Sequence, residues 1–305
     1  MTRPETSVPA PPREQGDAGP GPDRGSIALA APTAPTVTAR TRGRRQHQLT
    51  RIRSPLSVQW RIGLGAIGVA TVFVLWIVAS NSSGGDFLLP TPAATWKAFV
   101  ELWRDGLFLK DLWASLYRIG IGYAISVLLG VIFGIAIGTF SSVEAFFEPQ
   151  FGFLRYIPAS ALTPVLLLWL GIGESPKITL IVLGTVFFNV VMIADVARLV
   201  PRELLNASYT LGARRWTVIR RVVFRHSVPG IMDVARVNMA AAWLMLVVAE
   251  LLAAQEGLAF RIVRAQRFRA VDTMFALLIV FGVIGLVSDL FLRWLRNASS
   301  PWAKS

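Results

Sequence analysis

The chain alternates between long apolar runs and shorter polar connections. Six of the runs are apolar over about 20 residues, the length of helix that crosses roughly 30 Å of hydrocarbon. The pattern therefore predicts an all-α membrane protein in which residues 51–305 form one six-span domain. The expected transmembrane helices lie near residues 62–80, 117–139, 151–171, 177–197, 230–251 and 273–293.

The basic residues around these runs predict the orientation of the chain. An even number of spans places both termini on one side, and that side holds roughly twice as many Lys and Arg residues as the other, which assigns it to the cytoplasm. The connection 198–229 is then cytoplasmic. A cluster on the outer side runs against this trend: Arg261, Arg264, Arg267 and Arg269.

Residues 1–50 show no apolar periodicity. They are rich in Pro, Ala, Gly and Thr, with too few large apolar groups to offset the entropy of ordering. We expect a disordered cytoplasmic tail, followed by a first span that is an uncleaved anchor.

Composition narrows the function further. The chain is 53% hydrophobic and 16% charged, contains no Cys and has only two His residues, so we expect no disulfide framework, no metal site and no catalytic group. The net charge is +13, but the Arg residues lie beside apolar runs, where basic flanks orient a chain in the bilayer. We therefore expect the basic residues to contact the lipid bilayer, and we expect no binding of nucleic acid.

Two of the expected spans contain glycines or prolines at positions that affect helix packing or helix continuity. Gly130, Gly134 and Gly138 repeat at every fourth position, which lets a second helix backbone approach that face closely. Pro158 and Pro164 interrupt the third expected span, so either the helix is kinked or it lines a passage.

Few polar groups fall inside the spans. Asn189 and Asn238 either bond a neighbouring helix or face a wet translocation path, and Glu250 is either a gate contact or a carboxylate at the interface. Asp233 and Arg236 are one turn apart and can pair. No ladder of carboxylates crosses the centre, and no phosphate-binding G-x-x-x-x-G-K-[ST] loop is present. Transport by this chain would therefore draw its energy from another subunit, and we expect no cofactor here.

The cytoplasmic connection has a pattern of its own. Pro201 can start a helix in which Leu204, Leu205, Ser208 and Leu211 share one face, and Gly212 can end it in the left-handed conformation. A second short basic helix is expected to follow until Pro229 marks the return to the membrane. Such a projection suits either the groove of a partner protein or a surface of anionic lipid headgroups.

This connection resembles the cytoplasmic loop of ABC importer permeases. The pattern of that loop is E-A-A, three residues, G, nine residues, then I-x-L-P. The spacing is kept here, with Asn206, Ala207 and Ser208 at E-A-A and Gly212 at the glycine. Several letters differ: Asn replaces Glu, Ser replaces the second Ala, and the final positions carry Val222, Phe224 and Arg225.

The rest of the chain resembles the permeases of the nitrate, sulfonate and taurine importer group over about residues 60–295. The segments that carry the resemblance are, in order, "LPTPAATWKAFVEL" (89–102), "DLWASLYRIGIGYAISVLLGVIFGIAIG" (111–138), "LRYIPASALTPVLLLWLGIGESPK" (154–177) and "AAWLMLVVAELLAAQEGLAF" (241–260).

The resemblance implies a permease dimer that works with cytosolic ABC ATPase subunits and an extracytoplasmic substrate-binding protein. ATP would bind the ATPase subunits, and this chain would be a transport subunit with no enzymatic step. The residues implied to couple it to the ATPase are Asn206, Ala207, Ser208, Gly212, Ala213 and Pro229.

The substrate stays open between several classes. Aliphatic sulfonate, taurine and nitrate are anions that the outer Arg cluster would attract, although the same cluster could dock a binding protein or lie at lipid headgroups. Importers of thiamine-precursor pyrimidines and other small organics share the scaffold. From other classes, a six-span channel or receptor would need no ATPase, and a membrane enzyme would need a set of convergent reactive groups.

Overall fold

The computed structural model describes residues 57–82 and 89–300, so the expected tail over residues 1–50 lies outside the described residues. All regular structure in the described ranges is helical. The elements are α1 (Val58–Ser82), α2 (Pro92–Arg104), α3 (Leu107–Thr139), α4 (Ser141–Leu154), η2 (Ala159–Leu162), α5 (Thr163–Leu170), α6 (Glu174–Arg198), α7 (Arg202–Thr210), α8 (Arg215–Val218), η3 (Ile219–Val223), α9 (Phe224–Ala253), α10 (Leu258–Arg267) and α11 (Val271–Ser299).

The all-α membrane class is confirmed by the length and apolarity of these helices. Five helical stretches in the described ranges can cross a membrane, beginning at Val58, Leu107, Glu174, Arg215 and Val271, and the number rises to six if α4 and η2–α5 are together one span. These two parts are bent by 81° at their break.

The third expected span, over residues 151–171, is interrupted in the structure, as its two prolines predicted. Its residues are divided between the end of α4 and the η2–α5 segment. The two prolines explain the break, because neither has an N–H to donate to the preceding turn. Pro158 is extended, at φ −62° and ψ 108°, and precedes η2, while Pro164 lies in the first turn of α5, where a missing N–H is tolerated.

The glycine stripe of α3 packs directly against α6. A Cβ placed on Gly130 or Gly134 would lie 2.8 Å from the Cβ of Asn189 or Ile193, and one on Gly138 would lie 2.6 Å from the carbonyl oxygen of Ala194. Real side chains do not approach so closely, so the expected close contact of two helices is confirmed.

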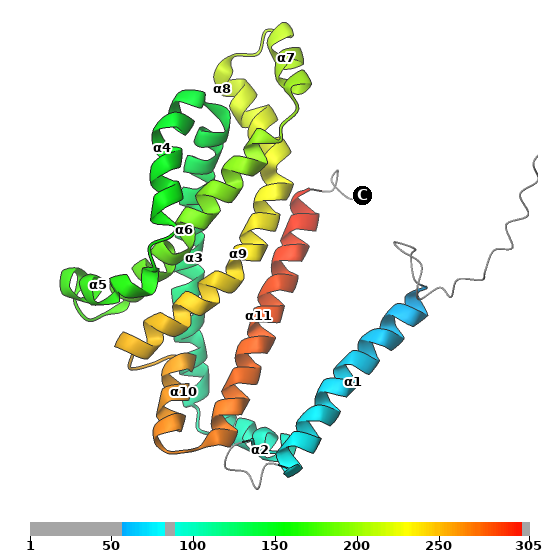
Figure 1. Ribbon diagram of the computed structural model, residues 1–305, viewed down its shortest axis with the longest axis vertical. Coiled ribbons are helices and arrows are strands. Elements are labelled where there is room, and N and C mark those ends of the chain that lie inside the picture. The colour runs from blue at the N-terminus through cyan, green and yellow to red at the C-terminus, as the bar shows by residue number, and fades with distance from the viewer. Residues whose placement is uncertain (1–56, 83–88, 301–305) are drawn as a thin grey trace, which may run out of the picture. The chain divides into compact units, whose positions relative to one another are not determined.

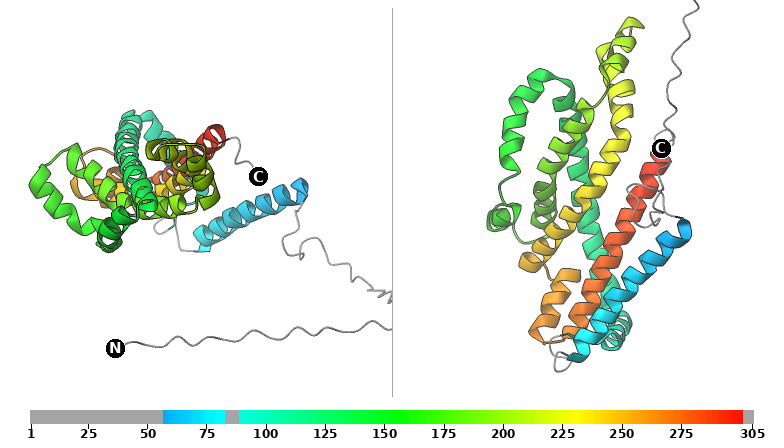
Figure 2. Two further views of the ribbon diagram at one scale, coloured as in Figure 1. Left: turned by 90° about the horizontal axis from the view of Figure 1, so that it is seen from above. Right: turned by 45° about the vertical axis from the view of Figure 1, so that its right-hand side comes forward.

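Helices α6, α9 and α11 run lengthwise beside one another, as both side views show (Figures 1 and 2). Helices α7 and α8 lie at one end of this group, and α2 and α10 lie at the other (Figure 1). The polar connection and the outer Arg cluster are thus at opposite ends, as the predicted topology requires.

Pro229 does not end a helix, so the prediction that a short second helix stops at this residue is wrong. Helix α8 continues through the π-helical segment η3 into α9, and Pro229 lies inside α9. A π-helical turn re-routes backbone hydrogen bonds locally, so the change of winding occurs ahead of the proline. The basic segment after Gly212 is consequently the first part of a long spanning helix.

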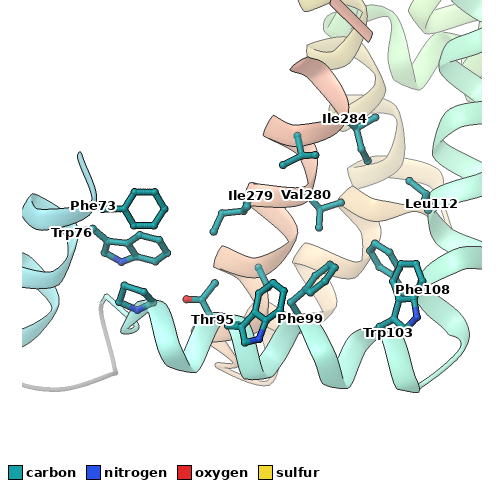
Figure 3. Close-up of a pocket in the computed structure, with 14 residues that line it drawn as sticks. Phe73, Trp76, Thr95, Phe99, Trp103, Phe108, Leu112, Ile279, Val280 and Ile284 are labelled. Carbon is teal, nitrogen blue, oxygen red and sulfur yellow. The ribbon is translucent and has the colours of Figure 1, made fainter. Parts of the chain in front are cut away.

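Aromatic contacts join α2 to α3, through Phe99 and Trp103 on Phe108, and α1 to α11, through Trp76 on Phe275. Thr91 caps α2 by accepting a hydrogen bond from the N–H of Ala94 at 3.2 Å, and the Trp76 indole donates to the carbonyl of Pro90 at 3.0 Å. An apolar groove of about 470 Å³ lies here. Figure 3 shows side chains of α1, α2 and α11 around it, among them Trp76, Phe99 and Ile279. Such aromatic groups are typical of a membrane interface.

Candidate functional sites

The first candidate site is the projection formed by α7, Gly212 and α8, which we call the coupling segment. Gly212 has a φ of +77°, confirming the expected left-handed end of α7. The N–H of Ala213 donates to the carbonyl of Ser208 at 3.0 Å, and that of Gly212 donates to Tyr209 at 2.9 Å. This pair of bonds is the Schellman motif, which satisfies two carbonyls that the helix end would leave free.

The coupling segment is attached by one face and exposed on the other. Val218 of α8 is 2% exposed, and Leu205 of α7 packs against a core cluster that contains Ile193 of α6 and Val223 of η3. In contrast, Leu211 and Trp216 are 87% and 71% exposed. The predicted topology places these apolar groups in the cytoplasm, where exposed apolar surface marks an interaction site.

The residues in the expected coupling frame occupy this projection, except for one. Asn206, Ala207 and Gly212 are exposed, and Ser208 and Ala213 are half-buried. The Ser208 hydroxyl donates to the carbonyl of Leu204 at 2.7 Å, so its hydrogen bond is made within α7. Pro229 lies apart from them, within α9.

The two asparagines of the expected path lie in a polar cluster between α3, α6 and α9. Asn189 is fully buried and donates to the hydroxyl of Ser126 at 2.9 Å, while Asn238 donates to the side-chain oxygen of Asn189 at 2.8 Å. Thr185 also donates to Ser126, at 2.7 Å. These bonds are those of the helix-bonding alternative, in which the amides hold three helices together.

Glu250 lies at the centre of a larger charged network near the α2 and α10 end. Its carboxylate is fully buried and accepts hydrogen bonds from Ser115 at 2.7 Å, from Arg118 at 2.8 Å and from the backbone N–H of Ala259 at 2.9 Å. Gly257 makes room for it, because a Cβ at that position would lie 2.4 Å from the Glu250 carboxyl carbon. A buried carboxylate is tolerated only with such partners.

Arg118 extends the network to α6. Its guanidinium bonds both oxygens of Glu174, at 2.6 and 2.9 Å, and also donates to the carbonyl of Glu256 at 2.6 Å. Glu174 accepts a further bond from Lys177 at 2.8 Å. The Arg118 and Lys177 side chains are only 3% and 6% exposed, whereas that of Glu174 is 45% exposed. One arginine thus links α3, α6 and the turn between α9 and α10.

Asp111 fixes the same turn from α3. Its carboxylate accepts a bond from the N–H of Gly257 at 2.9 Å and pairs with Arg261 of α10. Arg261 is therefore part of the charged network, while Arg264, Arg267 and Arg269 are exposed. The outer Arg cluster divides into one structural residue and three that face away from the core.

Ion pairs also join the helices toward the coupling segment. Asp233 pairs with Arg296 at 3.0 Å and Arg236 with Asp289 at 2.5 Å, so both bonds cross from α9 to α11. The expected pair within one helix, Asp233 with Arg236, is replaced by these two. Helix α11 offers each of the two residues an oppositely charged partner, so each pairs with the facing helix.

Sequence reasoning missed Arg118, Glu174 and Lys177 because charged residues near the end of a span are ordinarily interfacial flanks. A signal was present in α3. Asp111, Ser115 and Arg118 are four and three residues apart, which places three polar side chains on one face of an otherwise apolar helix. All three are buried.

The arrangement defines a helical membrane protein with an exposed projection at one end, and sequence comparison assigns the chain to a family. Residues 126–300 match the family described as binding-protein-dependent transport system inner membrane component. The chain belongs to this family and is a permease component of the ABC importer class.

Individual relatives agree with the family. A probable ABC transporter permease of Brucella melitensis is 33% identical over 79% of this chain and 97% of its own length. The taurine transport system permease of Escherichia coli is 32% identical over 82% of this chain and 92% of its own. Further relatives are named as permeases for aliphatic sulfonates, nitrate and formylaminopyrimidine.

The fold is shared with solved transporters. An inward-facing structure of the MetNI methionine ABC transporter aligns with a TM-score of 0.57 and 16% identity, covering 63% of this chain and 96% of that chain. This likeness supports the helical architecture of the permease.

Proposed function

We propose that this chain is the transmembrane subunit of an ATP-driven importer that carries a small anionic solute into the cytoplasm by alternating access. Aliphatic sulfonate, taurine and nitrate are the solute classes we favour. Two permease chains would form the pathway, two cytosolic ABC ATPase subunits would supply the energy, and an extracytoplasmic binding protein would deliver the solute. Both termini would be cytoplasmic, and ATP would bind only the ATPase subunits.

The observation that carries this proposal is the coupling segment. Its exposed Leu204 and Leu211 lie on α7 and at its end, and Trp216 lies at the start of the long helix that follows Gly212, at 44%, 87% and 71% exposure. An apolar surface of this kind fits a hydrophobic groove on another protein. The opposite face is anchored through Leu205 and Val223 to the core between α6 and α9.

This attachment gives a physical route from ATP to the solute path. Closure of the ATPase dimer would move the docked coupling segment, and because α8, η3 and α9 are continuous, the movement would pass into a spanning helix as a rigid-body shift. No covalent step is required of this chain.

Electrostatics and relatives support an anionic solute. Arg264, Arg267 and Arg269 are exposed on the side that the distribution of Lys and Arg assigns to the outside, and a positive surface raises the local concentration of anions. The relatives named for aliphatic sulfonates, taurine and nitrate are named for solutes that carry a negatively charged sulfonate or nitrate group. The formylaminopyrimidine relative keeps a second candidate, a thiamine-precursor pyrimidine or another small organic, on the same scaffold.

Docking can be tested by changing the exposed face alone. We expect Leu211→Asp to abolish the co-purification of vanadate-sensitive ATP hydrolysis with the tagged chain, because a charge would enter the apolar contact. Thr210→Ala, at the neighbouring position on α7, is the matched control and should keep it. Full ATP hydrolysis with Leu211→Asp, or its absence from the unmodified chain, would contradict the proposal and favour a channel or receptor without an ATPase.

A further inference from the structure

The charged network encloses an opening that the function above does not use. A cleft of about 350 Å³ is lined by charged and polar residues together with two residues of the preceding turn: Arg118, Glu174, Lys177, Gln255 and Glu256, with Ile172 and Gly173. Two of its cations, Arg118 and Lys177, have side chains only 3% and 6% exposed. Cations buried to that degree require anionic partners.

One carboxylate meets that requirement for both cations. Glu174 accepts the two parallel N–H bonds of the Arg118 guanidinium, at 2.6 and 2.9 Å, and the Lys177 ammonium bond at 2.8 Å. This fork with an added ammonium is the geometry that holds any small oxyanion with two available oxygens. The first turn of α6, where Glu174 lies, also favours negative charge.

Glu174 is the replaceable member of the network. Its side chain is 45% exposed and it is the first residue of α6, so rotation about its side-chain bonds can carry the carboxylate into solvent. Glu250, in contrast, is 0% exposed and is held by Ser115, Arg118 and Ala259. If Glu174 leaves, Arg118 stays paired with Glu250, and Lys177 has no other carboxylate within ion-pair distance in the described part of the chain.

We propose that Arg118 and Lys177 form a binding site for a small oxyanion, in which the Glu174 carboxylate is the resident occupant that an incoming anionic solute displaces. The solute class is a monovalent oxyanion such as an alkanesulfonate, which presents oxygens to the fork as a carboxylate does. This inference rests on the proposed import function, because it assigns to that anionic solute a first contact on the permease. The site stays neutral when empty, since Glu174 returns to it.

The test is anion binding to the full chain in lipid nanodiscs, measured by calorimetry with ethanesulfonate as the probe. Glu174→Gln should bind ethanesulfonate roughly tenfold or more tightly than the unmodified chain, because the anion then takes over charge-assisted bonds without competition. Ethyl methyl sulfone, an uncharged analogue, should show no such gain.

Glu256→Gln is the matched control. Glu256 lines the same cleft and carries the same charge, but its side chain pairs with Lys110 at 2.6 Å, and the Lys110 side chain is 63% exposed. The substitution changes the net charge equally without freeing the fork, so affinity should change by less than about threefold, as for an exposed ion pair. Equal gains in the two variants would show general attraction of anions and overturn the site.

A double variant guards against loss of folding. Glu174→Gln with Lys177→Gln leaves no unpaired cation and should lose the gain in ethanesulfonate affinity. If the Glu174→Gln variant can be purified in folded form only when ethanesulfonate is present, this rescue of folding by the anion supports the site. No gain in affinity and no effect of the anion on thermal stability or yield would overturn it.

Uptake separates this inference from the proposed function. If Glu174→Gln gains affinity for ethanesulfonate but the unmodified chain supports no ATP-dependent uptake of it, the binding site stands and the import function is contradicted. If the unmodified chain shows normal uptake but Glu174→Gln gains no affinity for ethanesulfonate, the binding site is contradicted and the import function stands.

Discussion

Replacing Arg118 by methionine tests whether the charged network is a unit. The structure pairs two cations, Arg118 and Lys177, with two carboxylates, Glu174 and Glu250. Arg118→Met leaves Glu250, which is 0% exposed, without a cation. Removing one partner of a buried ion pair costs about 3–5 kcal/mol, so we expect a loss of that size in the free energy of unfolding.

A second substitution should then restore part of the stability. Glu250→Gln in the Arg118→Met background removes the uncompensated charge, keeps an oxygen that accepts from Ser115, and leaves Glu174 paired with Lys177. We expect the double variant to be more stable than Arg118→Met alone by about 1–3 kcal/mol, the usual penalty for a buried group left without its partner. SDS titration of the purified chain in mixed micelles, followed by tryptophan fluorescence, measures each free energy. A double variant no more stable than Arg118→Met would refute the reasoning.

Three further outcomes are expected. Gly138→Leu should destabilise the chain by about 1–3 kcal/mol through overpacking against α6. Gly120→Ala should be tolerated, because a Cβ at that position meets open space, and similar thermal midpoints for both variants would contradict this. Asn189→Ala should lower the free energy of unfolding by about 0.6–1.7 kcal/mol for each lost interhelical bond. Solute preference in competitive uptake should stay unchanged, and an altered preference would place Asn189 in the path instead. Arg198→Gln should lower stability by only about 0–1 kcal/mol per partly exposed ion pair, an effect that 1 M salt removes; a salt-independent loss would contradict it.

Elements set by local pattern could be predicted from the sequence. Apolar runs of spanning length predicted α6 and α11, because a helix in lipid must satisfy its backbone internally wherever it occurs. The stripe of Gly130, Gly134 and Gly138 predicted a close helix contact for a similar reason, since only a side without Cβ atoms admits another backbone. The left-handed turn at Gly212 also followed from residue type.

Features that depend on distant partners were not predictable. Arg118 and Glu250 are 132 residues apart, and each alone is an ordinary charged residue near the end of a span. Pro229 was expected to end a helix, yet α9 continues through it because tertiary packing overrides the local preference. The bend between α4 and α5 had a visible cause in Pro158, but its size of 81° depends on contacts that no local pattern contains.

Uptake of labelled ethanesulfonate tests the central claim most directly. The measurement compares cells that lack this chain with cells that express it unmodified or as Gly212→Pro, in which the left-handed turn of the coupling segment is barred. We expect ATP-dependent uptake with the unmodified chain, competition by unlabelled taurine or nitrate, and none with Gly212→Pro, although that variant still inserts in the membrane. Uptake independent of ATP, or equal uptake with Gly212→Pro, would contradict the account.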